Sequence, residues 1–333
     1  MNVYFKTSNL LINTQNNSFS THYTPSIFYK SNITKDIFEK NNEISQTKDI
    51  NIVGTAYKDK IKIVFSDIDG TITPHDDIIS DKTLKAVNLL QEYNIPIILT
   101  TARCYKDTLP IINQLSKKPD YTIVLQGGSI IDKNGKAIIE NSITTESSYK
   151  LHHWYKNEFS KDKNSHLIMY FNDQPYSESC IQFPWKARSL IVHVKSFSDL
   201  LKQNMKLQKA ILYKTDSQNS DYKLISQSFD TINQTELCIL QTGKHFYEFQ
   251  KQNVSKEKAI KYILDELDIK PNNTMVIGDS ANDINMLNFI KQQNGLSVAM
   301  GNATDNVKQY ANAITSDINQ EGFSKAISSF MKN

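Results

Sequence analysis

Several residue types are scarce in this chain of 333 residues, and each scarcity excludes a class of protein. Cysteine occurs only at Cys104, Cys180 and Cys238, without a CxxC pair, which argues against a disulfide framework and a structural zinc site. The apolar runs are far shorter than the roughly 20 residues that a membrane helix needs. The 38 basic and 35 acidic residues leave a net charge of +3, which predicts no polyanion-binding surface. We therefore expect a cytoplasmic monomer or weak homo-oligomer that binds neither nucleic acid nor membranes.

Arginine is almost absent, because Arg103 and Arg188 are the only two among the 38 basic residues. Lysine cannot replace the planar guanidinium fork in the bidentate binding of an anion. Each of the two arginines is therefore a candidate for a specific role.

The first 35 residues contain no aspartate or glutamate and are rich in serine, threonine and asparagine. This composition is typical of a disordered or loosely attached extension, and an acid-poor, serine-rich segment is also typical of an organellar transit peptide. Because the segment lacks the arginines that transit peptides favour, organellar targeting is only the alternative to a cytoplasmic location. Residues 36–60 are charged and mixed in character, and we interpret them as a linker that completes an N-terminal extension over residues 1–60.

Strand-like and helix-like patterns alternate from Ile61 onward. Short apolar runs predict strands over residues 61–65, 97–99 and 121–125, and the segments between them have the spacing of amphipathic helices. The alternation returns between residues 256 and 310. This pattern predicts a doubly wound, Rossmann-like parallel sheet of the α/β class.

Between the two alternating parts, residues 144–243 are rich in aromatic residues and follow no regular alternation. We interpret them as an inserted α+β domain, which leaves residues 61–143 plus 244–333 as the α/β core. A chain of this length is expected to hold about two domains, at roughly 150 residues each.

Polar residues follow three of the predicted core strands. Asp67 and Asp69 close the first strand. The run Thr-Thr-Ala-Arg at 100–103 closes the second, and Gly278–Asp283 follows the strand predicted over 274–277. Such residues also cap turns and helices, so each segment alone has a structural explanation. Open α/β sheets bind ligands at this edge, where several carboxylates together can hold a divalent cation while one of them attacks an electrophile. A ligand set made only of oxygen atoms favours Mg²⁺ over Zn²⁺.

In their order along the chain, these segments resemble the motifs of the haloacid-dehalogenase-like (HAD) phosphohydrolases, specifically the Cof-type branch. Asp67–Thr71 resembles the first motif and Thr101 the second. Lys256, within Val-Ser-Lys, resembles the third motif, and Gly278–Asp283 resembles the fourth. Ser297–Ala303 resembles the segment that follows the fourth motif in Cof proteins, so the likeness covers all but the N-terminal extension.

The resemblance implies an enzyme that uses an aspartate as its nucleophile. Asp67 would form an aspartyl-phosphate, and Asp69 would first donate a proton to the leaving oxygen and then accept one from water. Mg²⁺ would be bound by Asp67, the backbone carbonyl of Asp69, and Asp279. Asp283 would lie behind these ligands and orient Lys256 or a metal-bound water.

The resemblance also implies where the substrate binds. Phosphoryl oxygens would be bound by Thr101, the N–H of Ala102 and Lys256, and Asn282 joins the candidate substrate-binding residues. The inserted domain would be a cap that closes over the site, excludes water and contacts the leaving group. Arg188 is the single arginine of that insertion, so it either lies on the surface or binds the leaving group.

The implied function is the Mg²⁺-dependent hydrolysis of small phosphorylated metabolites, with sugar phosphates as the expected class. A phosphomutase of the same superfamily is the alternative, and a non-catalytic sugar-phosphate sensor is a third candidate. The sequence departs from the family pattern at five positions, where glycines, an asparagine or an alanine are usual: Ala102, Gln126, Gly128, Asn253 and Glu257. These departures affect loop shape and cap contacts, so they leave the substrate open but not the reaction.

Overall fold

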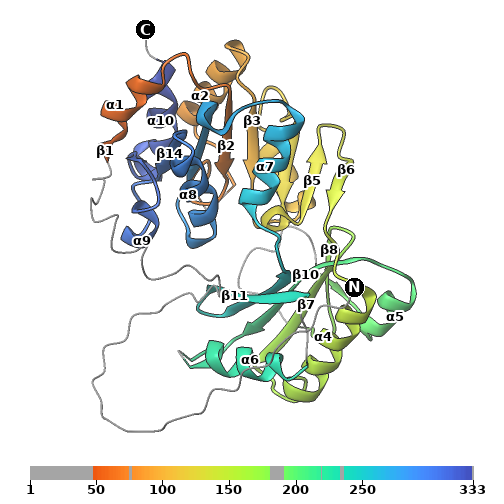
Figure 1. Cartoon of the computed structure of the whole chain (residues 1–333). Coiled ribbons are helices and arrows are strands. Elements are labelled where there is room, and N and C mark those ends of the chain that lie inside the picture. The colour runs from red at the N-terminus through yellow and green to blue at the C-terminus, as the bar shows by residue number, and fades with distance from the viewer. Residues whose placement is uncertain (1–47, 75–76, 181–190, 219, 233–235, 332–333) are drawn as a thin grey trace, which may run out of the picture. The chain divides into compact units, whose positions relative to one another are not determined.

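The computed structural model describes residues 48–74, 77–180, 191–218, 220–232 and 236–331. The described residues build two β-sheets, one of nine strands and one of six, with helices packed against both (Figure 1). The extension or transit peptide expected over residues 1–47 lies outside the described residues, and so does Arg188. None of the helices in the described part of the chain combines the length and hydropathy that a membrane-spanning helix needs.

The nine-stranded sheet contains the predicted doubly wound core. Its strands follow the order β1-β15-β14-β13-β2-β3-β4-β5-β6, and neighbours are parallel from β1 across to β4 and antiparallel from β4 to β6. The strands are β1 Lys48–Asp49, β2 Ile63–Asp67, β3 Ile97–Thr100, β4 Tyr121–Val124, β5 Ser129–Asp132, β6 Ala137–Glu140, β13 Thr274–Gly278, β14 Leu296–Ala299 and β15 Ala313–Ile314. The central parallel strands confirm the α/β class expected from the alternation.

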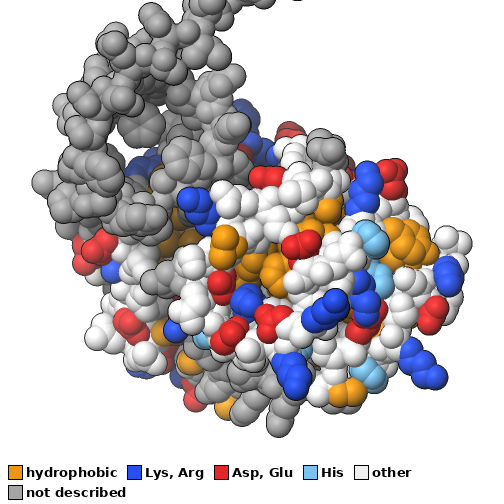
Figure 2. Space-filling view, turned by 90° about the horizontal axis from the view of Figure 1, so that it is seen from below, with side chains coloured by type: hydrophobic (Ala, Val, Ile, Leu, Met, Phe, Trp, Pro, Cys, Tyr) orange, Lys and Arg blue, Asp and Glu red, His pale blue; other side chains and the backbone are white. Residues whose placement is uncertain are grey.

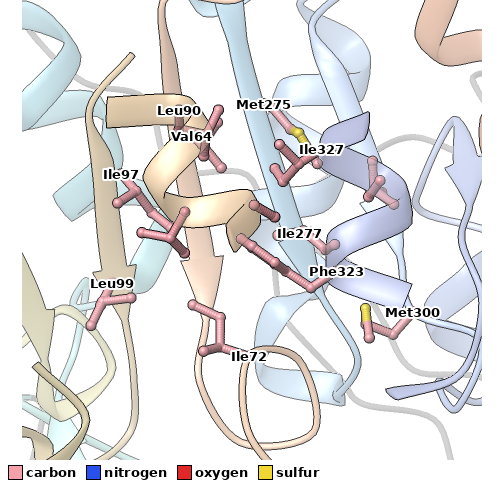
Figure 3. Packing of buried hydrophobic residues seen from close by; sticks show 14 of the residues in the cluster. Val64, Ile72, Leu90, Ile97, Leu99, Met275, Ile277, Met300, Phe323 and Ile327 are labelled. Atoms are coloured by element: carbon pink, nitrogen blue, oxygen red, sulfur yellow. The ribbon is translucent and has the colours of Figure 1, made fainter. Parts of the chain in front are cut away.

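Helices cover both faces of this sheet, which explains why its central strands are apolar on both sides. They are α1 Ile50–Val53, η2 Gly54–Tyr57, α2 Asp81–Glu92, α3 Tyr105–Ile112, η3 Leu125–Gly127, α7 Lys256–Glu266, η4 Pro271–Asn273, η5 Ala281–Asp283, α8 Ile284–Gln292, α9 Asp305–Lys308, η6 Ile318–Gln320 and α10 Gly322–Met331. Along β2, Val64 packs with Leu90 of α2 and Phe323 of α10 on one face (Figure 3). Ile63 and Phe65 pack with α7 and α8 on the other face, as expected from the alternation of side chains along a strand.

The interpretation of residues 36–60 as a linker is wrong for its last part. β1 pairs in parallel with β15 and so adds a strand to the sheet. Asp49 caps α1, whose Ile50 is buried, and Gly54 approaches α10 so closely that a Cβ there would overlap Ser329. These elements have two to four residues each, which is too short for the periodicity of the sequence to reveal them.

The six-stranded sheet and its helices form a second module, which we call the cap module (the described residues of 144–251). Its strand order is β11-β12-β10-β7-β8-β9, antiparallel except for β8 and β9. Its elements are α4 Thr145–Glu158, β7 Ser165–Phe171, β8 Gln174–Ser177, β9 Val192–His193, α5 Phe197–Lys202, β10 Leu207–Lys214, α6 Asp221–Asp230, β11 Leu237–Gly243 and β12 Phe246–Lys251. The predicted boundary at residue 243 is too early, because β12 forms a hairpin with β11 and also pairs with β10.

The cap module also caps a helix of the core sheet. Helix α3 begins after Cys104, whose side chain makes no capping hydrogen bond. Instead, the N–H of Tyr105 donates to Oδ1 of Asp173 at 2.6 Å, and the N–H of Lys106 donates to Oδ2 at 2.9 Å. Asp173 lies in the two-residue turn between β7 and β8, where both turn residues have the positive φ of a tight hairpin. The cap module therefore stabilises the helix that directly follows the polar run 100–103.

Figure 2 shows one face of the molecule, on which lysines and acidic side chains are interspersed with hydrophobic ones. Opposite charges that lie close together largely cancel at a distance, so this face does not carry a field of one sign. This agrees with the small net charge of +3.

Candidate active site

Three neighbouring strands of the core sheet end at the predicted site. In the order β13-β2-β3, the middle strand ends at Asp67, and Asp67 lies opposite Thr100, the last residue of β3. The three strands are parallel, so the loops that follow them leave the same edge of the sheet. The structure therefore brings together polar loops that are far apart in the sequence.

Lys256 lies at the centre of the site and is fully buried. Its Nζ is 2.5 Å from Oδ1 of Asp67 and 2.7 Å from Oδ1 of Asp283. Ser255 caps α7, since its side chain accepts the N–H of Lys258, and this cap places Lys256 in the first turn. Burial alone would lower the pKa of Lys256, but the negative charges of Asp283 and Asp67 outweigh burial and raise that pKa. Lys256 is therefore a permanent cation.

Three carboxylates gather around this lysine. One oxygen each of Asp67, Asp279 and Asp283 lie within 4.8 Å of one another. Burial, followed by the negative charge of Asp283, raises the pKa of Asp67 well above its usual value, although Lys256 partly offsets both. Burial and the charge of Asp283 also raise the pKa of Asp279, to about 6. The single ammonium does not compensate three carboxylates, so the cluster suits an additional hard cation with oxygen ligands.

Asp283 both belongs to this group and shapes the loop that carries Asp279. Its Oδ1 contacts Lys256, whereas its Oδ2 accepts the N–H groups of Asp279 at 3.1 Å and Ser280 at 3.0 Å. The resemblance suggested a position behind the metal ligands, and in the structure one oxygen of Asp283 lies within 4.8 Å of an oxygen of Asp67 and an oxygen of Asp279. Asn282, expected to bind substrate, accepts a hydrogen bond from Ser280 Oγ.

Two residues that were not expected to act at the site hold Asp279 in place. Thr71 Oγ1 donates to Oδ1 of Asp279 at 3.0 Å, and Asn302 Nδ2 lies 3.3 Å from Oδ2. Gly70 has φ +82°, and a Cβ there would collide with the Asp279 carboxylate, so this turn requires glycine. Thr71 and Asn302 both lie in segments that carry the family resemblance, and this was the only signal for them in the sequence.

Asp69 lies beside these three carboxylates, but its own carboxylate has a different partner. Arg103 binds its carboxylate in a bidentate manner, with Nε 2.7 Å from Oδ2 and Nη2 in contact with Oδ1. Arg103 Nη1 also lies 2.8 Å from Oδ1 of Asp77. Arg103 was not among the predicted site residues, although the scarcity of arginine pointed to it.

The loop after β3 lies against both modules. Thr101 is buried, its Oγ1 accepts the N–H of Arg103 at 3.1 Å, and its carbonyl accepts the N–H of Gln126 at 2.9 Å. The carbonyl of Ala102 accepts a hydrogen bond from Lys209 of the cap module, with Nζ at 3.2 Å. The backbone of this loop, which we call the phosphate loop (residues 101–103), is therefore fixed on both sides.

Comparison with known proteins agrees with this geometry. The sequence pattern of the haloacid dehalogenase-like hydrolase family matches residues 64–327. Phosphatase YwpJ of Bacillus subtilis is 25% identical over 292 residues, which cover 79% of this chain and 97% of that protein. The 5-amino-6-(5-phospho-D-ribitylamino)uracil phosphatase YcsE of the same organism is 24% identical over 268 residues, which cover 80% of this chain and 94% of that protein.

A solved structure shows the same fold. The HAD subclass IIB sugar phosphatase BT4131 superimposes with a TM-score of 0.65 at 22% sequence identity, over 81% of this chain and 98% of that one. The family match spans most of the described residues, including both strands that end in acidic loops. The chain therefore belongs to the haloacid dehalogenase-like hydrolase family, and it is a hydrolase of the phosphatase type.

Proposed function

We propose that this protein is a Mg²⁺-dependent phosphatase that transfers the phosphoryl group of a small metabolite to Asp67 and then to water. The observation that carries the proposal is the buried contact of Lys256 Nζ with Asp67 Oδ1, at 2.5 Å, beside two further carboxylates. Burying such a cluster costs free energy that a purely structural role does not need. Phosphoryl transfer, in contrast, depends mainly on positioning and on the neutralisation of charge.

In this proposal, a carboxylate oxygen of Asp67 attacks phosphorus, and the bond from phosphorus to the leaving oxygen breaks. Lys256 binds a phosphoryl oxygen, because it keeps its positive charge while buried. The Thr101 hydroxyl, whose oxygen already accepts the N–H of Arg103, donates a hydrogen bond to a phosphoryl oxygen, and the N–H of Ala102 donates another. Water then hydrolyses the aspartyl-phosphate and restores Asp67.

Asp69 is the proposed general acid and base. It gives a proton to the leaving oxygen in the first step and takes one from the attacking water in the second. Arg103 holds both oxygens of Asp69 and so fixes the direction of the carboxyl group. Arg103 is a positioning residue in this scheme, since it acts through Asp69.

The residues present fit a divalent cation. Asp67 and Asp279 would hold it, with Asp283 beside them and the backbone carbonyl of Asp69 as a further oxygen ligand. Burial, together with their mutual repulsion, raises the pKa values of Asp67 and Asp279, and this supports the assignment. When bound, Mg²⁺ neutralises negative charge on the acids and on the phosphoryl group.

Sugar and polyol phosphates are the proposed substrates. The relative YcsE acts on a phosphorylated ribityl compound, and BT4131 is a sugar phosphatase. Both names describe those proteins, and they support a hydroxylated leaving group for this one. The cap module supports the same proposal, because the polar side chain of Lys209 reaches the phosphate loop.

A phosphomutase is the second candidate, and one experiment separates the two. Phosphate release is measured on a panel of sugar and polyol phosphates with Mg²⁺, with and without a small amount of a sugar bisphosphate. A phosphatase releases phosphate without the bisphosphate, whereas a mutase isomerises its substrate only with it. Binding of a sugar phosphate with neither reaction would instead indicate a sensor.

A further inference from the structure

Three polar side chains interrupt an apolar face of the cap module: Lys209, Glu248 and Gln250. They are 3%, 6% and 5% exposed. Lys209 lies opposite Gln250, and Glu248 lies opposite Ile211, on the neighbouring strands β10 and β12, so all three point to the same face of the sheet. The apolar residues of this face, such as Ile211 and Tyr170, pack with core residues that follow β3 and β4. The polar cluster therefore lies where the cap module meets the core sheet.

Two contacts place this cluster beside the proposed phosphate site. Lys209 Nζ donates to the carbonyl of Ala102 in the phosphate loop at 3.2 Å. Gln250 Nε2 donates to the carbonyl of Val254 at 3.4 Å, two residues before Lys256. The cluster thus touches both segments that carry the proposed ligands of the phosphoryl group.

The cluster is electrically balanced. Lys209 Nζ lies 3.0 Å from Oε2 of Glu248, and both side chains are buried. Oε1 of Glu248 accepts a hydrogen bond from Thr242 at 3.0 Å, and the Lys209 ammonium lies 5.4 Å from the centre of the Tyr170 ring. The charge of the lysine is therefore already neutralised and oriented before any substrate binds.

The same region contains two buried polar atoms without a hydrogen-bond partner among the described residues. They are Oε1 of Gln250, an acceptor, and Nε2 of Gln126, a donor. Gln126 is 4% exposed, has φ +61°, and follows β4 with its N–H bonded to the carbonyl of Thr101. A buried amide atom without a partner costs free energy, so such atoms call for a ligand that satisfies them. A hydroxyl group can satisfy either one, since it both donates and accepts.

We propose that Lys209, Glu248 and Gln250, together with Gln126, form a leaving-group subsite for an uncharged, hydroxylated group, and that Glu248 excludes leaving groups with a second negative charge. The inference rests on the proposed phosphatase function and specifies its substrate class. A second anionic group would need Lys209, which already binds Glu248, and it would lie close to a buried carboxylate. Such a repulsive element provides specificity as directly as an attractive contact does.

Two matched ligands test the exclusion. Glucitol 6-phosphate and 6-phosphogluconate are both open chains, and they differ only at carbon 1, which carries a hydroxyl group in the first and is a carboxylate in the second. Each is measured as a competitive inhibitor of p-nitrophenyl phosphate hydrolysis with Mg²⁺, which yields an inhibition constant whether or not the ligand is itself hydrolysed. We expect wild-type protein to bind glucitol 6-phosphate more tightly. Glu248→Gln should shift the ratio of the two constants by about 10-fold or more towards 6-phosphogluconate, because it releases the Lys209 charge for the carboxylate.

Two further variants control this result. Lys209→Met/Glu248→Gln removes both charges and leaves no unpaired buried ion, and it should cancel the gain for 6-phosphogluconate. Lys206→Met removes an exposed lysine of the same region, which lies 3.3 Å from Glu140, and it should leave both constants unchanged. Thermal unfolding of each variant confirms that it is folded. If Glu248→Gln does not fold, the ratio of the two constants for wild-type protein alone decides the matter.

The outcomes separate this inference from the proposed function. Three results would each overturn the proposed subsite. They are equal ratios in wild type and Glu248→Gln, a wild-type preference for 6-phosphogluconate, and no inhibition by either ligand. In contrast, wild-type protein that hydrolyses no phosphate ester with Mg²⁺ would overturn the phosphatase itself.

Discussion

Arg103 binds both carboxylate oxygens of Asp69, with Nε 2.7 Å from Oδ2 and Nη2 in contact with Oδ1. The two N–H groups of the guanidinium fork match the two oxygens, which gives the contact a defined direction. Its third nitrogen, Nη1, contacts Asp77 and anchors the arginine to a second loop. Asp69 is therefore fixed by a side chain from the neighbouring strand end.

Arg103→Lys should lower kcat by about 10-fold, since one charge-assisted hydrogen bond contributes roughly 1.5–3 kcal/mol and lysine cannot bind both oxygens. Asp69→Asn should lower kcat by about 10²–10⁴-fold, as expected for a general acid and base. Because Arg103 acts through Asp69, the double variant should be no slower than Asp69→Asn alone. Multiplicative losses would instead show that Arg103 binds the substrate directly.

Asp67→Asn should abolish turnover, because the amide has the same shape but is barely nucleophilic. The raised pKa of Asp67 means that its ionised form is unfavourable in the metal-free fold. The Tm of the variant without metal should therefore be no lower than that of wild type. Asp265→Asn, an exposed aspartate on α7, is the matched control and should keep full activity. More than a few per cent of residual turnover in Asp67→Asn would contradict covalent catalysis.

Removal of divalent cations with EDTA should inactivate the enzyme, and Mg²⁺ should restore it better than Ca²⁺, whose looser coordination misplaces the reacting groups. The pKa of Asp279 is about 6, above its usual value, so the metal-free protein loses stability as the pH rises through 6. A bound cation offsets that loss. The rise in Tm on adding Mg²⁺ should thus be larger at about pH 7.5 than at about pH 5, and Asp279→Asn should reduce it. An equal rise at both pH values would place the ion elsewhere.

Glu178 should make the cap module sensitive to acid. Burial alone would raise its pKa, but His152, the N–H of Phe197 and Lys156 outweigh burial and lower the pKa from 4.5 to about 2. A lowered pKa contributes stability that is complete above pH 4.5 and is lost as the pH falls towards 2. Wild type should therefore exceed Glu178→Gln in Tm at neutral pH, and the difference should shrink below pH 4.5. A difference that does not change with pH would mean that Glu178 acts through packing alone.

The core sheet and the acidic loops could be predicted from the sequence because both depend on local patterns. Ile63 to Phe65 is apolar on both faces of its strand, and Asp67 comes at the end of that strand, so its place at the sheet edge follows from the order of the chain. Lys256 is different. Its helix was predictable, but its burial against Asp67 depends on how α7 packs across the sheet.

The short N-terminal elements, the assignment of β12 and the partners of the long side chains depend on contacts that no local sequence pattern predicts. Asp49 caps a helix of four residues, which has no periodicity to detect. The segment of β12 looks like any short strand, and only its pairing with β10 and β11 assigns it to the cap module. Arg103 and Lys209 have long side chains whose directions are set by partners in other segments, namely Asp69 and the carbonyl of Ala102.

Through Asp173, the cap module caps the N-terminus of α3, which is a helix of the core sheet. If the cap module swings away from the core, the amides of Tyr105 and Lys106 lose their acceptors and become exposed to water. Each opening therefore costs about 1 kcal/mol, which is the typical contribution of a helix N-cap. It also frays the first turn of α3, which follows Arg103 in the chain. The rate of hydrogen–deuterium exchange at these two amides would therefore report on opening of the cap module, although neither residue belongs to that module.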